Sequence, residues 1–367
     1  MTAEEKTSGA AASPLPVTID RARCVRMRHA SASCSRCADA CGPRAIEIRD
    51  GALSLFPSKC TGCGACAAAC PTDAAKLSES LALPEEELAS GARGKGTLRI
   101  ACRETAEDEP GVRVRCLRAL SPSRLLSLFA DGAREIALAS GRCASCPGAA
   151  PGVLQALIAE TEKAGAQAGF SPRITAEEKP RRGAIDLRRR FFFRRAAARA
   201  AAPEKEAGIP VLPDRDTFCN PADDRLTHEV PASRAKLTAA LQALRPEAMP
   251  EGFDPYELPP VFLRPRIGSD CAGCAMCAAA CPAGAIRQER TDGRLQLYAR
   301  SGACVNCGLC TDLCFRNAVS LEPETAGEAA LGLETLEFEE IEETDESQGD
   351  WGPKMGGLFG NAPVHWT

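Results

Sequence analysis

The chain has few aromatic side chains: they make up 4% of its 367 residues, although 44% of the residues are hydrophobic. A domain with so few large side chains has little core to stabilise it. Histidine occurs three times, with no carboxylate or serine pattern around any copy. The sequence has neither a Gly-x-Gly-x-x-Gly turn that opens a helix after a strand nor a Walker-type phosphate loop. Flavin, nicotinamide and nucleotide binding therefore have no support.

The chain also lacks a long apolar run. No stretch approaches the roughly 20 uncharged apolar residues of a membrane span, and residues 1–16 contain no apolar segment typical of a secretion signal. The net charge of −4 argues against general nucleic-acid binding, which usually needs a basic field. We therefore expect no transmembrane segment, no nucleic-acid partner and a location in the reducing cytoplasm.

Cysteine, by contrast, is abundant, with 21 residues. A disulfide scaffold is the alternative for a cysteine-rich secreted chain, but in a reducing cytoplasm thiolates bind metal rather than each other. Sixteen of the cysteines fall into four spaced runs, which are Cys24, Cys34, Cys37 and Cys41; Cys60, Cys63, Cys66 and Cys70; Cys271, Cys274, Cys277 and Cys281; and Cys304, Cys307, Cys310 and Cys314.

The last three runs keep the spacing C-x2-C-x2-C-x3-C, which is a ligand run for [4Fe–4S] clusters. A tight loop with this spacing presents three thiolates to one cube, so the fourth must come from elsewhere. Zinc is the alternative, because C-x2-C pairs also form zinc knuckles. Zinc sites usually pair two knuckles across a gap, whereas triads with a fourth cysteine recur here. The spacing therefore favours iron–sulfur clusters.

Residues 17–80 and 261–322 each hold two of these runs, and both segments resemble bacterial dicluster [4Fe–4S] ferredoxins. Each run is followed by a short apolar segment, namely AIEI, AAKL, AIRQ or AVSL, so each domain is itself a repeat of two halves. Pro71 and Pro282 follow their cysteines as that family prefers, whereas the other two runs lack this proline.

In that family the last cysteine of each run ligates the other cluster. The resemblance therefore implies four exchanged ligand sets, which we name set 1 (Cys24, Cys34, Cys37 and Cys70), set 2 (Cys41, Cys60, Cys63 and Cys66), set 3 (Cys271, Cys274, Cys277 and Cys314) and set 4 (Cys281, Cys304, Cys307 and Cys310). Nine residues rather than two separate Cys24 from Cys34. Loss of Cys24 as a ligand would suggest a [3Fe–4S] cluster in set 1.

Residues 97–170 predict a small α/β unit. TLRIAC, VRVRC and EIALAS are typical of short strands, whereas PSRLLSLFADG and PGVLQALIAETEKAG have apolar residues at helical spacing. Alternating strands and helices predict a parallel sheet. Cysteines stand at or just beyond the carboxyl ends of the strands, where an open α/β sheet binds its ligand. Four thiols could meet there, and we name them the central set: Cys102, Cys116, Cys143 and Cys146.

The pattern from IAC through VRVRCLRALSPSRLLSLFADGAREIALASGRCASC resembles the delta subunit of methyl-viologen-reducing hydrogenase and related thioredoxin-like [2Fe–2S] domains. The final C-x2-C departs from the longer spacing of many relatives. In those proteins the subunit relays electrons within a larger redox complex. The resemblance implies one [2Fe–2S] cluster at the central set, with structural zinc as the alternative.

Residues 171–260 are charged and Pro-rich, and we interpret them as a linker in which only RAKLTAALQAL is helical. Cys219 within it has no partner at ligand spacing and is expected to be an ordinary thiol. Arg188–Arg195, which reads RRRFFFRR, and the acidic, Gly-rich tail at 323–367 are candidate docking elements. The alternative for the basic segment is a solvated linker helix without a docking role, although three adjacent Phe residues favour a contact surface.

The expected fold class is α+β, with two ferredoxin-like dicluster domains flanking a small thioredoxin-like α/β domain and long irregular linkers. No residue pattern supplies an acid, base or nucleophile, so we expect electron transfer rather than catalysis. The expected partner is a catalytic redox subunit (hydrogenase, formate dehydrogenase or another molybdopterin enzyme, or disulfide reductase) or a soluble electron carrier. The alternatives are a ferredoxin-type accessory or maturation protein for a molybdoenzyme and a zinc-rich scaffold. Because cluster binding would stabilise such small cores, the apo protein should be largely unfolded outside its central segment.

Overall fold

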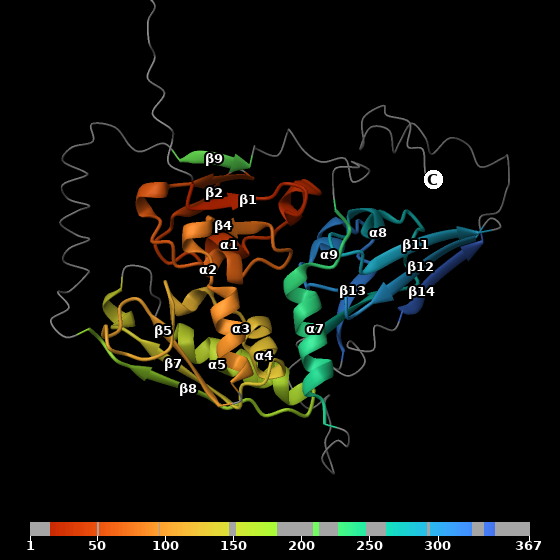
Figure 1. Cartoon of the computed structure of the whole chain (residues 1–367). Coiled ribbons are helices and arrows are strands. Elements are labelled where there is room, and N and C mark those ends of the chain that lie inside the picture. The colour runs from red at the N-terminus through yellow and green to blue at the C-terminus, as the bar shows by residue number, and fades with distance from the viewer. Residues whose placement is uncertain are drawn as a thin grey trace, which may run out of the picture.

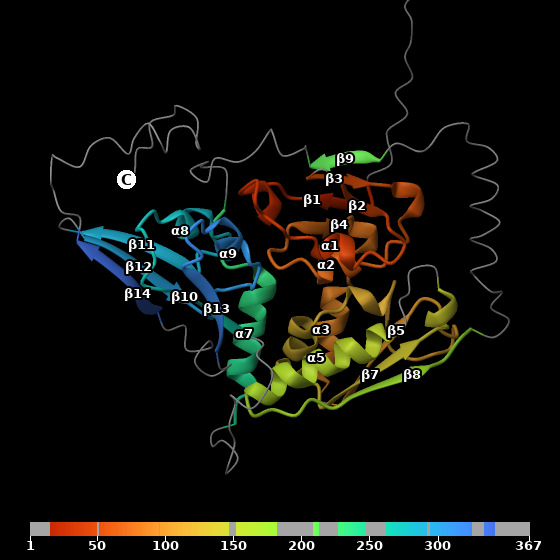
Figure 2. The ribbon, with the colours of Figure 1, turned by 180° about the vertical axis from the view of Figure 1, so that it is seen from behind.

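The computed structural model describes residues 15–49, 51–94, 96–146, 152–181, 208–212, 227–246, 262–291, 294–324 and 334–341. They form two dicluster domains and a central domain, with helix α7 (Ala232–Leu244) between the central domain and the second dicluster domain (Figure 1). The reverse view shows the first dicluster domain packed on the central domain (Figure 2). Arg188–Arg195, Cys219 and the tail beyond residue 341 lie outside the described residues.

The first dicluster domain consists of short strands around two one-turn helices. Strand β1 pairs with β4, and β2 forms an antiparallel hairpin with β3. Two of these strands, β2 and β4, fall on the short apolar segments that follow the cysteine runs. The bounds are β1 Val17–Ile19, α1 Arg36–Asp39, β2 Ile46–Arg49, β3 Ala52–Leu55, α2 Ala65–Ala68 and β4 Ala75–Leu77.

The second dicluster domain repeats this arrangement. Strand β10 pairs with β13, and β11 forms an antiparallel hairpin with β12. Burial alternates along β12, as expected for a strand with one face against a core. The bounds are β10 Phe262–Ile267, α8 Met276–Ala280, β11 Ile286–Thr291, β12 Arg294–Arg300, α9 Leu309–Leu313 and β13 Val319–Glu324. The predicted internal repeat is therefore present in the fold.

Each hairpin gains a third strand from outside its predicted domain. Strand β9 (Ile209–Leu212), from the expected linker, pairs with β3, and β14 (Glu334–Ile341), from the expected tail, pairs with β12. A hairpin edge offers unpaired backbone groups, so an added strand satisfies them. In β14, the side chain of Glu337 is 3% exposed, and its Oε1 lies 3.0 Å from Arg266 Nη1. Part of the acidic segment therefore belongs to the second dicluster domain.

The central domain has a four-stranded sheet that is parallel throughout, in the order β6-β5-β7-β8. The three predicted strands and two predicted helices are present, and the sheet and core also include β8 and α3, which lie outside 97–170. The bounds are α3 Glu85–Arg93, β5 Thr97–Cys102, β6 Val112–Val114, α4 Pro122–Ala130, β7 Glu135–Ser140, α5 Val153–Gln167 and β8 Ile174–Glu178.

One face of this sheet carries the largest hydrophobic core of the described residues. Ile100 and Ile136 from the sheet pack with Leu125 and Phe129 of α4 and with Leu88 of α3. These side chains alternate along the strands with residues that face away from the helices. Most of the buried side chains in this core are aliphatic, and Cys102 is its one cysteine among the described residues.

Helix α7 is the helix expected inside the linker, but it acts as a packing element. Leu237 and Leu241 lie in one buried cluster with Leu126 of α4, Ala164 of α5 and Phe262 of β10. The helix therefore joins the central domain to the second dicluster domain through apolar contacts. The segment interpreted as a linker supplies β8, β9 and α7, because β8 and β9 pair with strands outside it and apolar side chains of α7 pack against residues far away in the sequence.

Candidate iron–sulfur sites

Three of the four ligand loops place a left-handed residue on each side of their middle cysteine. These pairs, with φ between 53° and 78°, are Gly62 and Gly64, Gly273 and Ala275, and Asn306 and Gly308. Glycine and asparagine tolerate positive φ better than most residues. Alternation between left- and right-handed backbone makes a concavity whose N–H groups converge, which suits an anionic group such as an iron–sulfur cluster. In the remaining loop, helix α1 begins two residues after Cys34 instead.

The last cysteine of each run lies in a second repeated turn. Its Sγ accepts a hydrogen bond from the backbone N–H four residues later, at 3.1 to 3.3 Å, from Ala45, Ala74, Ala285 and Ala318. The residue before each donor has positive φ, and these are Arg44, Asp73, Gly284 and Asn317. The turn fixes the sulfur in place, and N–H donors at sulfur help to set the reduction potential of a bound cluster.

In the first dicluster domain, the structure brings the last cysteine of each run to the triad of the other run. Burial raises the pKa of Cys24 to about 12, with contributions from the nearby thiols of Cys70 and Cys34. Burial also raises the pKa of Cys66 to about 12, and Cys41 contributes to that shift. Cys70 thus lies with set 1 and Cys41 with set 2.

The second dicluster domain shows the same exchange. Burial raises the pKa of Cys277 to about 12, with a contribution from Cys314. Burial raises the pKa of Cys307 to about 12, with contributions that include Cys281 and Cys304. The structure therefore brings together the members of sets 3 and 4. Their ligation of clusters stays a prediction.

Two pockets are each lined by one complete set. One contains the four cysteines of set 2 between the side chains of Val17, Leu55 and Leu77. The other contains the four cysteines of set 4 between Leu309 and Leu321. Four thiols in an apolar wall form a donor set that fits a [4Fe–4S] cube.

The insertion between Cys24 and Cys34 is a compact turn around two buried arginines. Arg26, 7% exposed, donates from Nη1 to the carbonyl oxygens of Cys34 at 3.0 Å and Ala32 at 3.3 Å. Arg28 is fully buried and donates to the Ala22 carbonyl oxygen at 2.9 Å. These bonds close the loop, so the nine intervening residues leave Cys24 beside Cys34.

The central set gathers at the carboxyl ends of parallel strands, as the sequence predicts. Cys102 ends β5, and its Sγ accepts the Gly141 N–H at 3.2 Å just beyond β7. Burial raises the pKa of Cys116 to about 12, with contributions that include Cys146 and Cys102. Burial likewise raises the pKa of Cys143, and Cys102 and Cys146 add to that shift. The four thiols therefore share one region.

None of the twenty cysteines in the described ranges forms a disulfide. Within the same ranges, no group of three or more His, Cys, Asp or Glu side chains is arranged to hold a single metal ion. None of the helices described by the structure combines the length and apolarity that crossing a membrane requires.

Two residues of the expected linker contact the wall of set 4, and sequence spacing did not reveal them. His228 Nδ1 donates to the Cys281 carbonyl oxygen at 2.9 Å. Arg234 donates to the carbonyl oxygens of Ser301 and Gly302, both at 3.1 Å. Burial lowers the pKa of Arg234 to about 10, against the opposing effect of Cys304. The guanidinium therefore adds positive charge near set 4.

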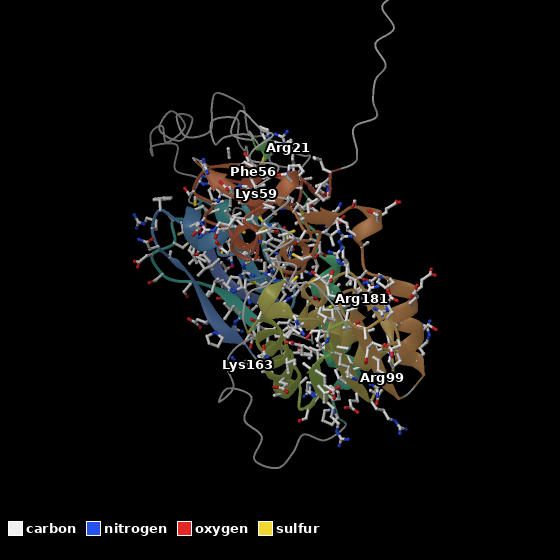
Figure 3. The ribbon with its side chains drawn as sticks, turned by 90° about the vertical axis from the view of Figure 1, so that its left-hand side faces the viewer. Arg21, Phe56, Lys59, Arg99, Lys163 and Arg181 are labelled. Carbon is white, nitrogen blue, oxygen red and sulfur yellow. The ribbon has the colours of Figure 1, made fainter. Side chains whose placement is uncertain are left out.

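A cation–π contact stabilises the turn that precedes Cys60 of set 2. Lys59, directly before Cys60, places Nζ 3.9 Å from the centroid of the Phe56 ring, and the two residues lie together in Figure 3. Lys59 Nζ also lies 3.0 Å from Glu47 Oε1. The contact fixes the turn that leads into the ligand loop.

Two segments of the chain match families of iron–sulfur domains. Residues 54–76 match a family described as a 4Fe-4S binding domain, and residues 270–324 match one described as a 4Fe-4S dicluster domain. The chain carries ferredoxin-type 4Fe-4S domains at both ends. The second match includes all eight cysteines of sets 3 and 4, whereas the first includes the run Cys60–Cys70 but not the run with the insertion. No curated protein and no solved structure matches the chain. The two matches support an iron–sulfur electron-transfer protein.

Replacing Gly64 by alanine should open the contact between the first dicluster domain and the central domain. A Cβ at Gly64 would lie 2.6 Å from the Cβ of Ala119, at a backbone φ of +77°. Gly308 is the matched control, because its φ is +78° and the nearest atom to an added Cβ is 3.9 Å away. Both changes carry the strain of positive φ, about 1 kcal/mol or more, but only Gly64→Ala also overpacks the contact.

Hydrogen exchange measured by mass spectrometry on iron-loaded protein checks this prediction. We expect faster exchange around the 3-10 turn Leu117–Ala119 in Gly64→Ala and unchanged exchange there in Gly308→Ala. Equal exchange in the two variants would contradict the inferred overlap with Ala119.

Proposed function

We propose that this protein is the electron-wiring subunit of a redox complex, with one [4Fe–4S] cluster in each of sets 1 to 4 and one [2Fe–2S] cluster in the central set. The observation that carries the proposal is the convergence of exchanged cysteines in two domains, each of which contains a segment that matches a 4Fe-4S family. A cube held by four thiolates has no open iron for a substrate. Catalysis would therefore take place in a partner.

The bound clusters would supply one-electron storage, and the chain controls how they are held. In the ligand loops the backbone N–H groups of Gly62 and Asn306 donate to Cys60 and Cys304. Four further N–H···S bonds fix the last cysteine of each run. Val17 and Leu55 help to exclude water from set 2. Hydrogen bonds to sulfur and low solvent exposure are the means by which a protein sets cluster potentials.

The proximity of the central set to set 2 favours a redox role for it. Cys63 is among the thiols that contribute to the raised pKa of Cys116, after burial as the main cause. A [2Fe–2S] cluster at this position would exchange electrons with set 2, in keeping with a thioredoxin-like electron relay. Zinc is the alternative, but it has no redox activity, so a structural zinc ion would have no need to lie near set 2.

The partner we propose is a catalytic redox subunit in the cytoplasm. A soluble electron carrier would donate electrons to this subunit or accept electrons from it, through the clusters of this chain. Hydrogenase, formate dehydrogenase or another molybdopterin enzyme, and disulfide reductase are the classes that the resemblance suggests. Each of them needs single electrons delivered to or removed from a buried centre, which a chain of clusters provides.

The test is the content of iron, sulfide and zinc per chain in protein purified without oxygen, with electron paramagnetic resonance (EPR) of the reduced sample. We expect about 18 irons per chain, from four cubes and one [2Fe–2S] cluster, together with signals of reduced clusters. About 16 irons and one zinc would make the central set structural. Little iron with several zincs would overturn the proposed function.

A further inference from the structure

Two contacts link cysteine sets that belong to different domains, and both are built around the same kind of hydrogen bond. In each, an arginine next to a cysteine of one set donates a hydrogen bond to a backbone carbonyl inside a ligand loop of the next set. Arg115 precedes Cys116 of the central set, and Arg36 lies between Cys34 and Cys37 of set 1. We call these two places the central junction and the dicluster junction.

At the central junction, Arg115 Nε donates to the carbonyl oxygen of Thr61 at 3.3 Å. Thr61 lies between Cys60 and Cys63, so the bond enters the ligand loop of set 2. Arg118 Nη2 donates to the carbonyl oxygen of Ala40, one residue before Cys41, at 2.6 Å. Both bonds reach from the central domain to residues directly beside ligands of set 2.

At the dicluster junction, Arg36 Nη2 donates to the carbonyl oxygen of Asn306, which lies between Cys304 and Cys307 of set 4. The N–H and the hydroxyl of Ser33 both donate to Asp312 Oδ2, at 2.8 and 2.7 Å. An apolar cluster closes the same contact, formed by Val25, Ala32, Ala280 and Leu309 with Cys34 and Cys307 packed against it.

Each arginine is within electrostatic reach of thiols from both adjoining sets. Burial raises the pKa of Cys34 and raises that of Cys304 to about 11, and the positive charge of Arg36 opposes both shifts. Burial lowers the pKa of Arg115, whereas the thiols of Cys60 and Cys63 in set 2 and Cys116 in the central set act in the opposite direction. Each guanidinium therefore faces sulfur on both sides of its junction.

Within each dicluster domain the two sets also adjoin. Cys66 of set 2 lies in a buried cluster against which Cys37 of set 1 packs. Cys277 of set 3 likewise lies in a buried cluster against which Cys310 of set 4 packs. Together with the two junctions, these contacts place the five sets in a row.

We propose that Arg115 and Arg36 bridge adjoining redox sets and join all five into one series, which runs from the central set through sets 2, 1 and 4 to set 3. This inference rests on the proposed function. A cluster held by thiolates is negatively charged, and each added electron increases the repulsion between neighbours. A positive charge shared by two sets reduces that repulsion. The two arginines are positioning residues that make both neighbouring sets easier to reduce.

The test is a reductive titration, followed by EPR, of the full-length iron-loaded protein carrying Arg36→Gln or Arg115→Gln. For Arg36→Gln we expect the reduction equilibrium constants of two [4Fe–4S] clusters to fall about tenfold, which is about 59 mV for a one-electron couple. For Arg115→Gln we expect similar shifts in one [4Fe–4S] cluster and in the [2Fe–2S] cluster, whose signals differ. Arg36→Lys retains the charge and should restore most of the wild-type behaviour.

Arg316→Gln is the matched control. Arg316 lies two residues after Cys314 and donates to the Asp270 carbonyl oxygen at 3.2 Å, but this bond stays within one domain. We expect it to shift one cluster at most. A shift confined to one cluster in both Arg36→Gln and Arg115→Gln, or one equal to that of Arg316→Gln, would overturn the bridging role. Wild-type protein with little iron would instead overturn the proposed function.

Discussion

Removal of iron should unfold both dicluster domains and leave the central sheet folded. The core of the first dicluster domain contains few large residues, among them Met27, Leu53 and Leu55, and it is surrounded by cysteines of sets 1 and 2. The central core consists mainly of Leu, Ile and Phe side chains from the sheet and three helices. Metal binding contributes on the order of 10 kcal/mol to small metal-dependent folds, so the dicluster domains depend on it and the central domain much less.

Hydrogen exchange with mass spectrometry tests this on protein from which iron has been stripped by oxidation and chelation. Amides of 17–77 and 262–324 should lose protection, whereas those of β5 and β7 should keep it. Reconstitution with iron and sulfide is the control and should restore protection in both dicluster domains. Protected dicluster domains without iron would contradict the dependence of these folds on their clusters.

Paired cysteine substitutions should reveal the exchange of ligands through iron content. Cys41 and Cys66 both belong to set 2, although they come from different runs. Changing both to alanine should therefore remove one cluster, about four irons per chain. Cys37 and Cys41 belong to one run but to sets 1 and 2. Changing both to alanine should remove two clusters, about eight irons per chain.

The two double variants are controls for each other, because they share Cys41→Ala and each adds one further cysteine. Iron and sulfide analysis on anaerobically purified protein gives the comparison. If each run held its own cluster, the ranking would be reversed, and Cys37→Ala with Cys41→Ala would cost only one cluster. The reversed ranking would contradict the sets as assigned.

The sequence was most informative where structure follows local spacing. The three predicted strands and two helices of the central segment are confirmed, because each is specified by its own pattern of apolar residues. The cysteine runs likewise predicted their own loops, since two residues between ligands suffice for a tight turn. Cys24 is the exception, because the nine-residue spacer that follows it obeys no spacing rule and its closure depends on the buried side chains of Arg26 and Arg28.

The boundaries of the domains could not be predicted in the same way. The residues of β9 and β14 were assigned to the linker and the tail. A single strand is stable only when it pairs with the edge of a sheet, and the sequence does not show which edge that is. Helix α7 was recognisable as a helix, but its role required Leu126 and Phe262, which lie far from it in the sequence. The acidic composition of the tail suggested an exposed docking element, yet the side chain of Glu337 is buried and paired with Arg266.

The runs of candidate ligand cysteines are visible in the sequence, because a cluster needs cysteines at short intervals. Their exchange between runs was expected from the resemblance to dicluster ferredoxins. The neighbours of each group were decided by tertiary structure alone. Ser33 and Asp312 are 279 residues apart, and no local pattern announces their contact. Arg36 and Arg115 stand beside cysteines in the sequence, yet their position between two sets arises only when the domains pack together.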